Sequence, residues 1–109
     1  VAVLAAMKDA RFPKVSKEGI IDYRERTKEK VPMEKLPIAV TVYKMGKDLF
    51  VDPTDEEEKL YDSRLTITTT EDETICSLQK GGEGTLTTDD ISTMVDMATK
   101  HAKALRKAL

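Results

Sequence analysis

The chain has 109 residues, of which 18 are Lys or Arg and 20 are Asp or Glu, so its formal net charge is −2. This length predicts one domain, and a nearly neutral charge balance is no electrostatic signature of nucleic-acid binding. No apolar run reaches the roughly 18 residues of a membrane span, and the apolar opening VAVLAA lacks the basic leader of a signal peptide.

The lone cysteine, Cys76, excludes a disulfide framework and indicates a reducing compartment, so we expect a cytoplasmic protein. With one His and one Cys, the chain cannot form a structural zinc site, which needs about four such ligands. Neither a metal nor a cofactor is therefore predicted.

The beginning of the chain is typical of the later part of a helix, and its first residue is Val, so we expect a piece of a longer protein. Helical spacing predicts a helix from residue 1 to about 10, which Phe12 and Pro13 end, giving an N-terminal helix over 1–13. Residues 14–35 are polar and predict a long loop of weak internal order.

From Leu36 the pattern changes to period two, which is typical of half-buried strands. Strands are predicted over 36–44, 49–51, 64–70 and 74–79, with hairpins joining the first pair and the last pair. Between the pairs, Thr54 and the carboxylates that follow it predict a helix of one or two turns to about Tyr61.

The last predicted element is an amphipathic helix from Thr87 to the end of the chain. Thr87 and Asp90 have the spacing of a capping box, and apolar residues recur at intervals of three and four. The predicted fold is therefore α+β, a four-stranded and mostly antiparallel sheet flanked by an N-terminal helix and a long C-terminal helix. It forms one domain over 1–109, with the sheet and last helix in 36–109.

Several features of the sequence are candidate sites. Nine carboxylates between Asp52 and Glu73 favour a solvated surface over a metal site, because consecutive residues at a helix start point apart. Asp62 has two interpretations. It is either a catalytic carboxylate at a strand entry, or a structural residue that caps a turn or forms an ion pair with Arg64. We favour the structural interpretation. His101 is interpreted as a packing or exposed edge residue, and Cys76 as a buried small apolar residue.

Two further segments have a binding interpretation. The glycine-rich run at 80–84 can cradle a phosphate before a helix, but it lacks the P-loop ending, so a flexible connector is favoured. The 14–35 segment interleaves basic and acidic residues and offers only Tyr23 for base stacking. A solvated or subunit-docked loop is therefore favoured there over an RNA-binding arm.

The order of short motifs adds a family resemblance. LPIAVT, FVDPTDEEE, DSRLTIT, CSLQKGGEG and TTDDI occur in an order similar to the second half of RNase PH-like proteins. Within these the chain most resembles the non-catalytic RNase PH-like subunit of the archaeal RNA exosome, and VAVLAAMKDARFP resembles the helix that joins the two halves.

The resemblance implies a structural subunit of a hexameric ring that alternates with catalytic RNase PH-like subunits under RNA-binding cap subunits. Such a ring degrades RNA from its 3′ end with phosphate as the nucleophile, and the non-catalytic subunit shapes the partner's active site and helps to hold RNA. Catalytic members carry an Asp at the entry of the third strand, where this chain has Arg64. Arg cannot act as an acid at neutral pH, so no catalytic residue is expected here.

Two alternatives remain open at this point. In the first, the protein is itself an active phosphorolytic 3′-to-5′ exoribonuclease with Asp62 as the acid. In the second, it is a stand-alone protein-interaction domain, which predicts no affinity for a catalytic RNase PH-like partner.

Overall fold

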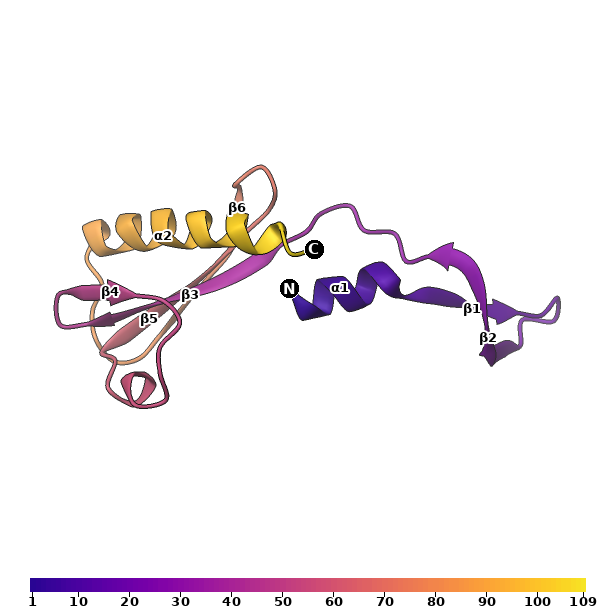
Figure 1. Cartoon of the computed structure of the whole chain (residues 1–109), viewed down its shortest axis with the longest axis horizontal. Helices are drawn as coiled ribbons and strands as arrows, with labels where there is room; N and C mark the ends of the chain where they lie inside the picture. The colour runs from indigo at the N-terminus through magenta and orange to yellow at the C-terminus, as the bar shows by residue number, and fades with distance from the viewer. The chain divides into compact units, whose positions relative to one another are not determined.

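Nearly all of the buried side chains lie in the C-terminal two thirds of the chain. The structure, a computed structural model, describes all residues 1–109. Its elements in chain order are α1 (Ala2–Asp9), β1 (Arg11–Val15), β2 (Ile21–Lys30), β3 (Ile38–Met45), β4 (Asp48–Phe50), the 3-10 turn η1 (Glu57–Lys59), β5 (Ser63–Thr69), β6 (Ile75–Gly81) and α2 (Thr88–Arg106) (Figure 1).

These elements form two compact units, residues 1–34 with Leu109 and residues 35–108. The sequence, in contrast, predicts a single domain over the whole chain. The distribution of apolar residues explains the division, because every buried residue except Leu4 lies at or after Ile38. Each unit is described by itself below. No helix in the chain is long and apolar enough to cross a membrane.

The four strands of residues 35–108 form one antiparallel sheet in the order β4-β3-β5-β6. Val40 pairs with Ile67 and Val42 with Leu65, so β-branched and Leu side chains from the two central strands share one face. The predicted α+β class, the four antiparallel strands and both hairpins are confirmed.

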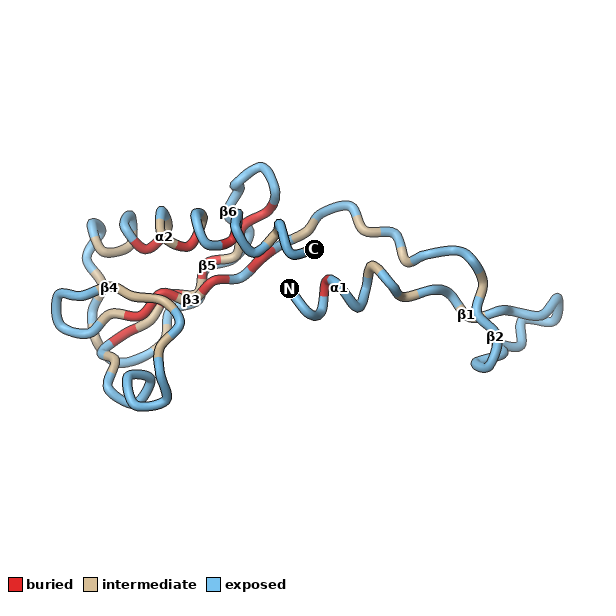
Figure 2. The backbone as a smooth tube through the Cα atoms, viewed as in Figure 1, coloured by how far each residue is buried: buried red, intermediate tan, exposed pale blue.

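Helix α2 covers this apolar face by packing on β3 and β5. Met94, Ala98 and Ala102 lie one or two turns apart on α2 and are almost fully buried. Figure 2 shows buried stretches along α2, β3 and β5. Two of these three residues are alanines, which allow the helix backbone to approach the sheet closely. The core is therefore the contact between one helix face and the inner face of the two central strands.

Both ends of α2 are tied to its surroundings by polar groups. At the N-terminus, Thr87 and Asp90 form the predicted capping box. At the C-terminus, Arg106 donates hydrogen bonds to the carbonyl oxygens of Leu36 and Thr69 and to the Thr69 hydroxyl. The last turn of the helix is thus fixed to the beginning of β3 and the end of β5.

Strand β6 lies at the edge of the sheet and is exposed from Ile75 to Lys80. The prediction that Cys76 is buried is therefore wrong, since its side chain is exposed. Sequence alternation could not distinguish a central strand from an edge strand, and α2 makes its main contacts with β3 and β5.

The predicted loop over 14–35 is also wrong, because β1 and β2 form an antiparallel hairpin there. Residues 16–19 make its turn, in which Ser16 accepts a hydrogen bond from Gly19, a residue with positive φ. Every residue of β2 except Thr27 is exposed, so the strand carries no apolar alternation from which it could be predicted.

The predicted helix over 54–61 is shorter than expected and consists of the 3-10 turn η1. Its entry is held by Thr54, whose backbone N–H donates to the Glu57 carboxylate at 2.8 Å. Repulsion among consecutive carboxylates and the absence of any buried residue leave little to extend the helix.

We predict that Ile67→Ala lowers the free energy of unfolding by about 2–5 kcal/mol, because it opens a cavity beneath α2. Its cross-strand neighbour Leu78 is 52% exposed, whereas Ile67 is 0% exposed. Leu78→Ala is therefore the matched control and should cost about 1 kcal/mol or less. Urea unfolding followed by far-UV circular dichroism measures both, and equal losses would contradict the packing of α2 on β5.

Candidate functional site at the start of β5

The entry to β5 brings together the two residues that the sequence singles out, Asp62 and Arg64. An open cleft of about 540 Å³ lies beside Asp62, lined by Glu58, Lys59, Tyr61, Asp62, Gly82, Glu83 and Gly84. The lining comes from η1, the residues before β5 and the glycine-rich run after β6. This is the part of the chain where a catalytic carboxylate is expected in RNase PH-like enzymes that the sequence resembles.

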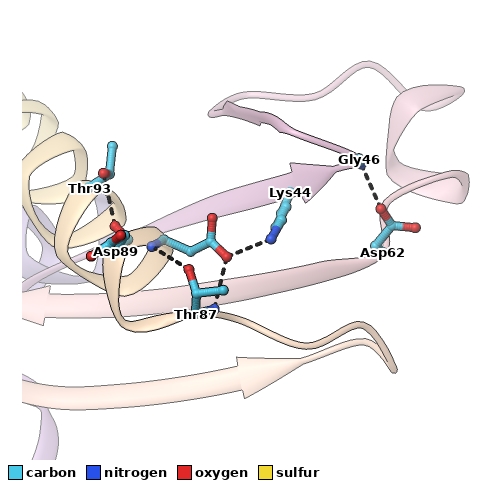
Figure 3. Close-up of polar contacts among 7 residues, drawn as sticks. Lys44, Gly46, Asp62, Thr87, Asp89 and Thr93 are labelled. Carbon is cyan, nitrogen blue, oxygen red and sulfur yellow. Dashed lines mark hydrogen bonds and ion pairs between the residues drawn. The ribbon is translucent and has the colours of Figure 1, made fainter.

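Asp62 forms three hydrogen bonds with backbone groups of nearby residues. Its carboxylate Oδ2 accepts a hydrogen bond from the Gly46 N–H at 2.6 Å, as Figure 3 shows. Its backbone N–H donates to the Lys44 carbonyl at 2.9 Å, and its carbonyl accepts from the Gly84 N–H at 2.8 Å. Of the two interpretations of Asp62, this geometry matches the turn cap, with the β3–β4 turn as the structure that it caps.

Arg64 lies on the face of the sheet opposite α2 and forms no ion pair with Asp62. Its guanidinium carbon lies 5.9 Å from the centre of the Tyr61 ring, a cation–π contact. A Cβ added at Gly81 would lie 2.7 Å from Arg64 Nε, so the absence of a side chain at Gly81 makes room for Arg64. The position therefore carries a fixed positive charge and no proton that can be donated near neutral pH.

Tyr61, the ring that Arg64 contacts, belongs to an aromatic cluster with Tyr43 and Phe50. The Tyr43 ring stacks on Phe50 with centroids 5.8 Å apart and meets the edge of Tyr61 at 5.2 Å. The Tyr43 hydroxyl donates to the Glu58 carboxylate at 3.1 Å, which ties η1 to the sheet. Such offset and edge-on aromatic pairs add to simple area burial. The ring over which Arg64 lies is thus held by contacts with a neighbouring strand.

The glycine-rich run at 80–84 allows the backbone after β6 to lie close to the backbone of Asp62. Gly82 has φ +80°, and a Cβ there would lie 2.7 Å from the Asp62 carbonyl oxygen. A Cβ at Gly84 would lie 2.8 Å from the same oxygen. These glycines are needed where the connector to α2 crosses the entry of β5, which matches the favoured interpretation of the run as a connector.

A second polar group nearby joins the sheet to α2. Lys44 Nζ lies 2.5 Å from Asp90 Oδ2, and both side chains are more than four fifths buried. The same carboxylate accepts the Thr87 N–H at 2.9 Å, and the Asp90 N–H donates to the Thr87 hydroxyl at 3.1 Å (Figure 3). Hydrogen bonds from Lys44 and then from Thr87 lower the pKa of Asp90 from 3.8 to about 2.

Sequence reasoning identified the capping box but missed Lys44. The available signal was that Lys44 interrupts the apolar series Ile38, Val40 and Val42 on the inner face of β3. A charge at a position of that series requires a partner when it is covered. In the structure this partner is Asp90, in the first turn of α2.

The remaining candidates do not converge on a site. No three His, Cys, Asp or Glu side chains lie so that they could hold a metal ion. His101 is exposed at the side of α2 and lines a shallow groove with Thr41 and Leu105. The acidic residues 55–58 are all exposed, in agreement with a solvated surface.

Residues 35–101 match the model of a family described as the 3′ exoribonuclease family, domain 2. The chain belongs to this 3′ exoribonuclease family. The matched residues contain all four strands of the sheet, the entry of β5 and most of α2. The resemblance drawn from the short motifs is thereby confirmed.

Curated members of the 3′ exoribonuclease family extend the similarity to the whole chain. The exosome complex component Rrp42 of Pyrococcus furiosus is 41% identical over 112 residues, covering 100% of this chain and 40% of that protein. The protein of the same name from Thermoplasma acidophilum is 39% identical over 107 residues, covering 98% of this chain and 38% of that protein. The chain therefore spans about two fifths of the length of these relatives.

Two solved structures share the fold of this chain. A structure described as an archaeal exosome core has a TM-score of 0.79 and 28% identity, over 96% of this chain and 40% of that chain. A structure of the Archaeoglobus fulgidus exosome with RNA bound to the active site has a TM-score of 0.69 and 32% identity, over 73% of this chain and 32% of that chain.

We predict that Gly82→Ala destabilises the chain more than Gly46→Ala. Both glycines have positive φ, so each substitution meets the roughly 1–2 kcal/mol cost of left-handed backbone for a residue with a Cβ. Only at Gly82 does the added carbon also collide with the Asp62 carbonyl, whereas nothing lies within 4 Å of it at Gly46. Urea denaturation of the two variants measures the difference, and equal losses would contradict the close approach at Gly82.

We predict that Asp90→Asn makes stability less dependent on pH in acid. The folded-state pKa of Asp90 is lowered to about 2, so its ionised form stabilises the fold above about pH 4, and this contribution is lost as the pH falls toward 2. The pKa of Asp72 is also lowered to about 2, so part of the acid dependence remains in the variant. Thermal melts across this range measure the effect, with Asp89→Asn as control because Asp89 forms no ion pair.

Proposed function

We propose that this chain is the second domain of a non-catalytic RNase PH-like subunit of an exosome ring. The observation that carries the proposal is the identity of 41% to an exosome complex component over the entire chain. The ring would degrade RNA from its 3′ end by phosphorolysis, and this subunit would shape the active site of its catalytic partner and help to hold RNA.

The residues at the start of β5 support the non-catalytic role. Arg64 stands where catalytic members of the family carry an Asp, and its guanidinium is held over Tyr61. Asp62, the alternative that the sequence singles out, uses its carboxylate to cap the turn at Gly46. A general acid must present its proton to the substrate, whereas this carboxylate accepts a hydrogen bond from the Gly46 backbone N–H.

The partners in this proposal are a catalytic RNase PH-like subunit in an alternating hexameric ring and RNA-binding cap subunits. RNA is contacted as part of that assembly, which works in the cytoplasm. The exposed edge strand β6 and the exposed hairpin of β1 and β2 support an assembly role, since both leave backbone or apolar surface uncovered.

The proposal is tested by phosphate-dependent release of nucleoside diphosphates from poly(A). The assay compares this protein alone, a catalytic RNase PH-like subunit alone, and the two mixed. We expect release to appear or rise strongly only in the mixture. Release by this protein alone would identify it as an enzyme, and a competent partner that gains nothing on mixing would favour a stand-alone interaction domain.

We predict that Asp62→Asn leaves the activity of the mixture nearly unchanged. The Asn side-chain oxygen can still accept the Gly46 hydrogen bond, so the turn is kept while the acid is removed. Loss of a true general acid would instead lower the rate by about 10²–10⁴-fold. Asp62→Ala removes both the acid and the cap of the turn at Gly46. We measure its melting temperature together with the rate of the mixture. A rate that falls only together with the melting temperature indicates a folding defect, not the loss of an acid.

A further inference from the structure

Strand β4 covers only one end of its neighbour β3. The register pairs Tyr43 with Phe50 and Met45 with Asp48, and residues 38–42 have no partner on this side of the sheet (Figure 1). On their other side the same residues pair with β5. Because β4 is the outermost strand, this half of β3 is an open edge.

The residues that follow β4 turn the chain away from β3. If the pairing of the two strands continued, Asp52 would lie opposite Thr41. Asp52 instead has a φ of 56°, a left-handed conformation that is unfavourable for a residue with a Cβ. The next residue is Pro53, which has no N–H to donate to a strand. Two consecutive residues thus end β4 and leave the edge of β3 uncovered.

The open edge presents the backbone groups of two residues. In a hairpin with a two-residue turn the residues beside the turn form a hydrogen-bonded pair, so Met45 and Tyr43 direct their N–H and C=O groups toward β4. Strand alternation gives Thr41 and Ala39 the same direction. Neither of these has a backbone partner on this side. The edge therefore offers two donors and two acceptors at strand spacing.

Apolar side chains lie beside these backbone groups. The open edge lines a groove of about 600 Å³, to which Val51 and Pro53 contribute from the end of β4 and Leu105 from α2. Leu105 is 41% exposed although it lies on a helix that packs on the sheet. An unpaired strand edge beside apolar side chains is the combination that binds an added strand.

Asp52 sets the charge of the groove. Its carboxylate forms no ion pair, and the groove is lined by no Lys or Arg. Residues 55–58, which follow it, are four exposed carboxylates. Negative charge at one end of an apolar groove is complementary to a Lys or Arg in the occupant.

We propose that the open edge of β3 binds an extended segment of a protein partner, whose alternate apolar residues are flanked by Lys or Arg. Backbone bonds to Ala39 and Thr41 hold the segment in line with β4, and Leu105 contacts its apolar side chains. A helix bonds its own backbone groups internally, so only an extended segment fits this edge. The inference goes beyond the proposed function, because this edge serves a partner whether or not the chain joins an exosome ring.

The test titrates the whole chain, labelled with nitrogen-15, with the end-blocked peptide KVTVTK. We expect the amide signals of Ala39 and Thr41 to shift and their hydrogen exchange to slow. At a peptide concentration of about ten times Kd the slowing should be about tenfold, because exchange then proceeds from the small unbound fraction. The amides of Val40 and Val42 point to β5 and should be protected already in the free chain.

Two substitutions at one position test the backbone bond itself. Ala39→Pro removes an N–H that takes no part in the pairing with β5, so the sheet should be kept while affinity for KVTVTK falls about tenfold or more. Ala39→Val keeps the N–H and should bind within about twofold of the unmodified chain. Melting temperatures verify that both variants fold, and the exchange measurement on the unmodified chain needs no substitution.

The charge of the groove is tested by Asp52→Asn. Asn tolerates the left-handed conformation, so the end of β4 is kept while the charge is removed. At low salt KVTVTK should bind this variant about two- to fivefold more weakly, as for an exposed ion pair. The uncharged peptide QVTVTQ should bind both proteins equally.

Several results would overturn the proposal. They are no binding at about 1 mM peptide, shift changes confined to β6 or to the hairpin of β1 and β2, and equal affinities of the Ala39→Pro and Ala39→Val variants. Protection of Ala39 and Thr41 that rises with protein concentration in the absence of peptide would assign the edge to a second copy of the chain. Because phosphorolysis plays no part in these readouts, failure here leaves the proposed function intact.

Discussion

The burial of the inner faces of β3 and β5 beneath α2 is the constraint on which the organised part of the molecule depends. Val42, Ile67 and Met94 are completely enclosed, and no other group of apolar side chains in the chain is comparably covered. The polar contacts at the two ends of the helix set its position over this face. Arg106 fixes the C-terminal turn to Thr69, and Asp90 fixes the N-terminal turn to Lys44. A helix without these contacts would still be amphipathic, but its register over the sheet would be less specified.

The same constraint determines what the entry of β5 can do. Lys44, at the end of β3, supplies its carbonyl to Asp62 and its ammonium to Asp90, so the β5 entry and the α2 cap are held by one residue. The glycine connector then crosses the Asp62 carbonyl at a distance that only glycine permits. The Asp62 carboxylate holds the Gly46 backbone, and the Arg64 guanidinium lies over the Tyr61 ring. Both side chains therefore have a structural contact at the start of β5.

The sequence predicts those elements in which one buried face makes apolar residues recur at a regular interval. In β3 and β5, alternate Ile, Val and Leu residues mark the buried face, and in α2 the buried Met and Ala residues recur at helical spacing. Burial leaves no such pattern in β2, whose side chains are exposed except for Thr27, and Cys76 follows the strand period of β6 although nothing covers it. At the site, the positions of Asp62 and Arg64 were predictable, but the Gly46 and Tyr61 contacts were not, because they join segments that are distant in sequence or depend on side-chain direction.

The hairpin of β1 and β2 differs from the rest of the chain in both burial and charge. A two-stranded hairpin by itself is marginally stable in water, and this one has no buried residue. Residues 11–30 carry seven basic and four acidic side chains, whereas residues 35–108 carry ten basic and fourteen acidic ones. Phe12, Val15 and Ile21 are exposed there as well. Because no core constrains the hairpin, its residues can present charge and apolar groups at the surface, whereas alternate residues of β3 and β5 must be apolar to pack beneath α2.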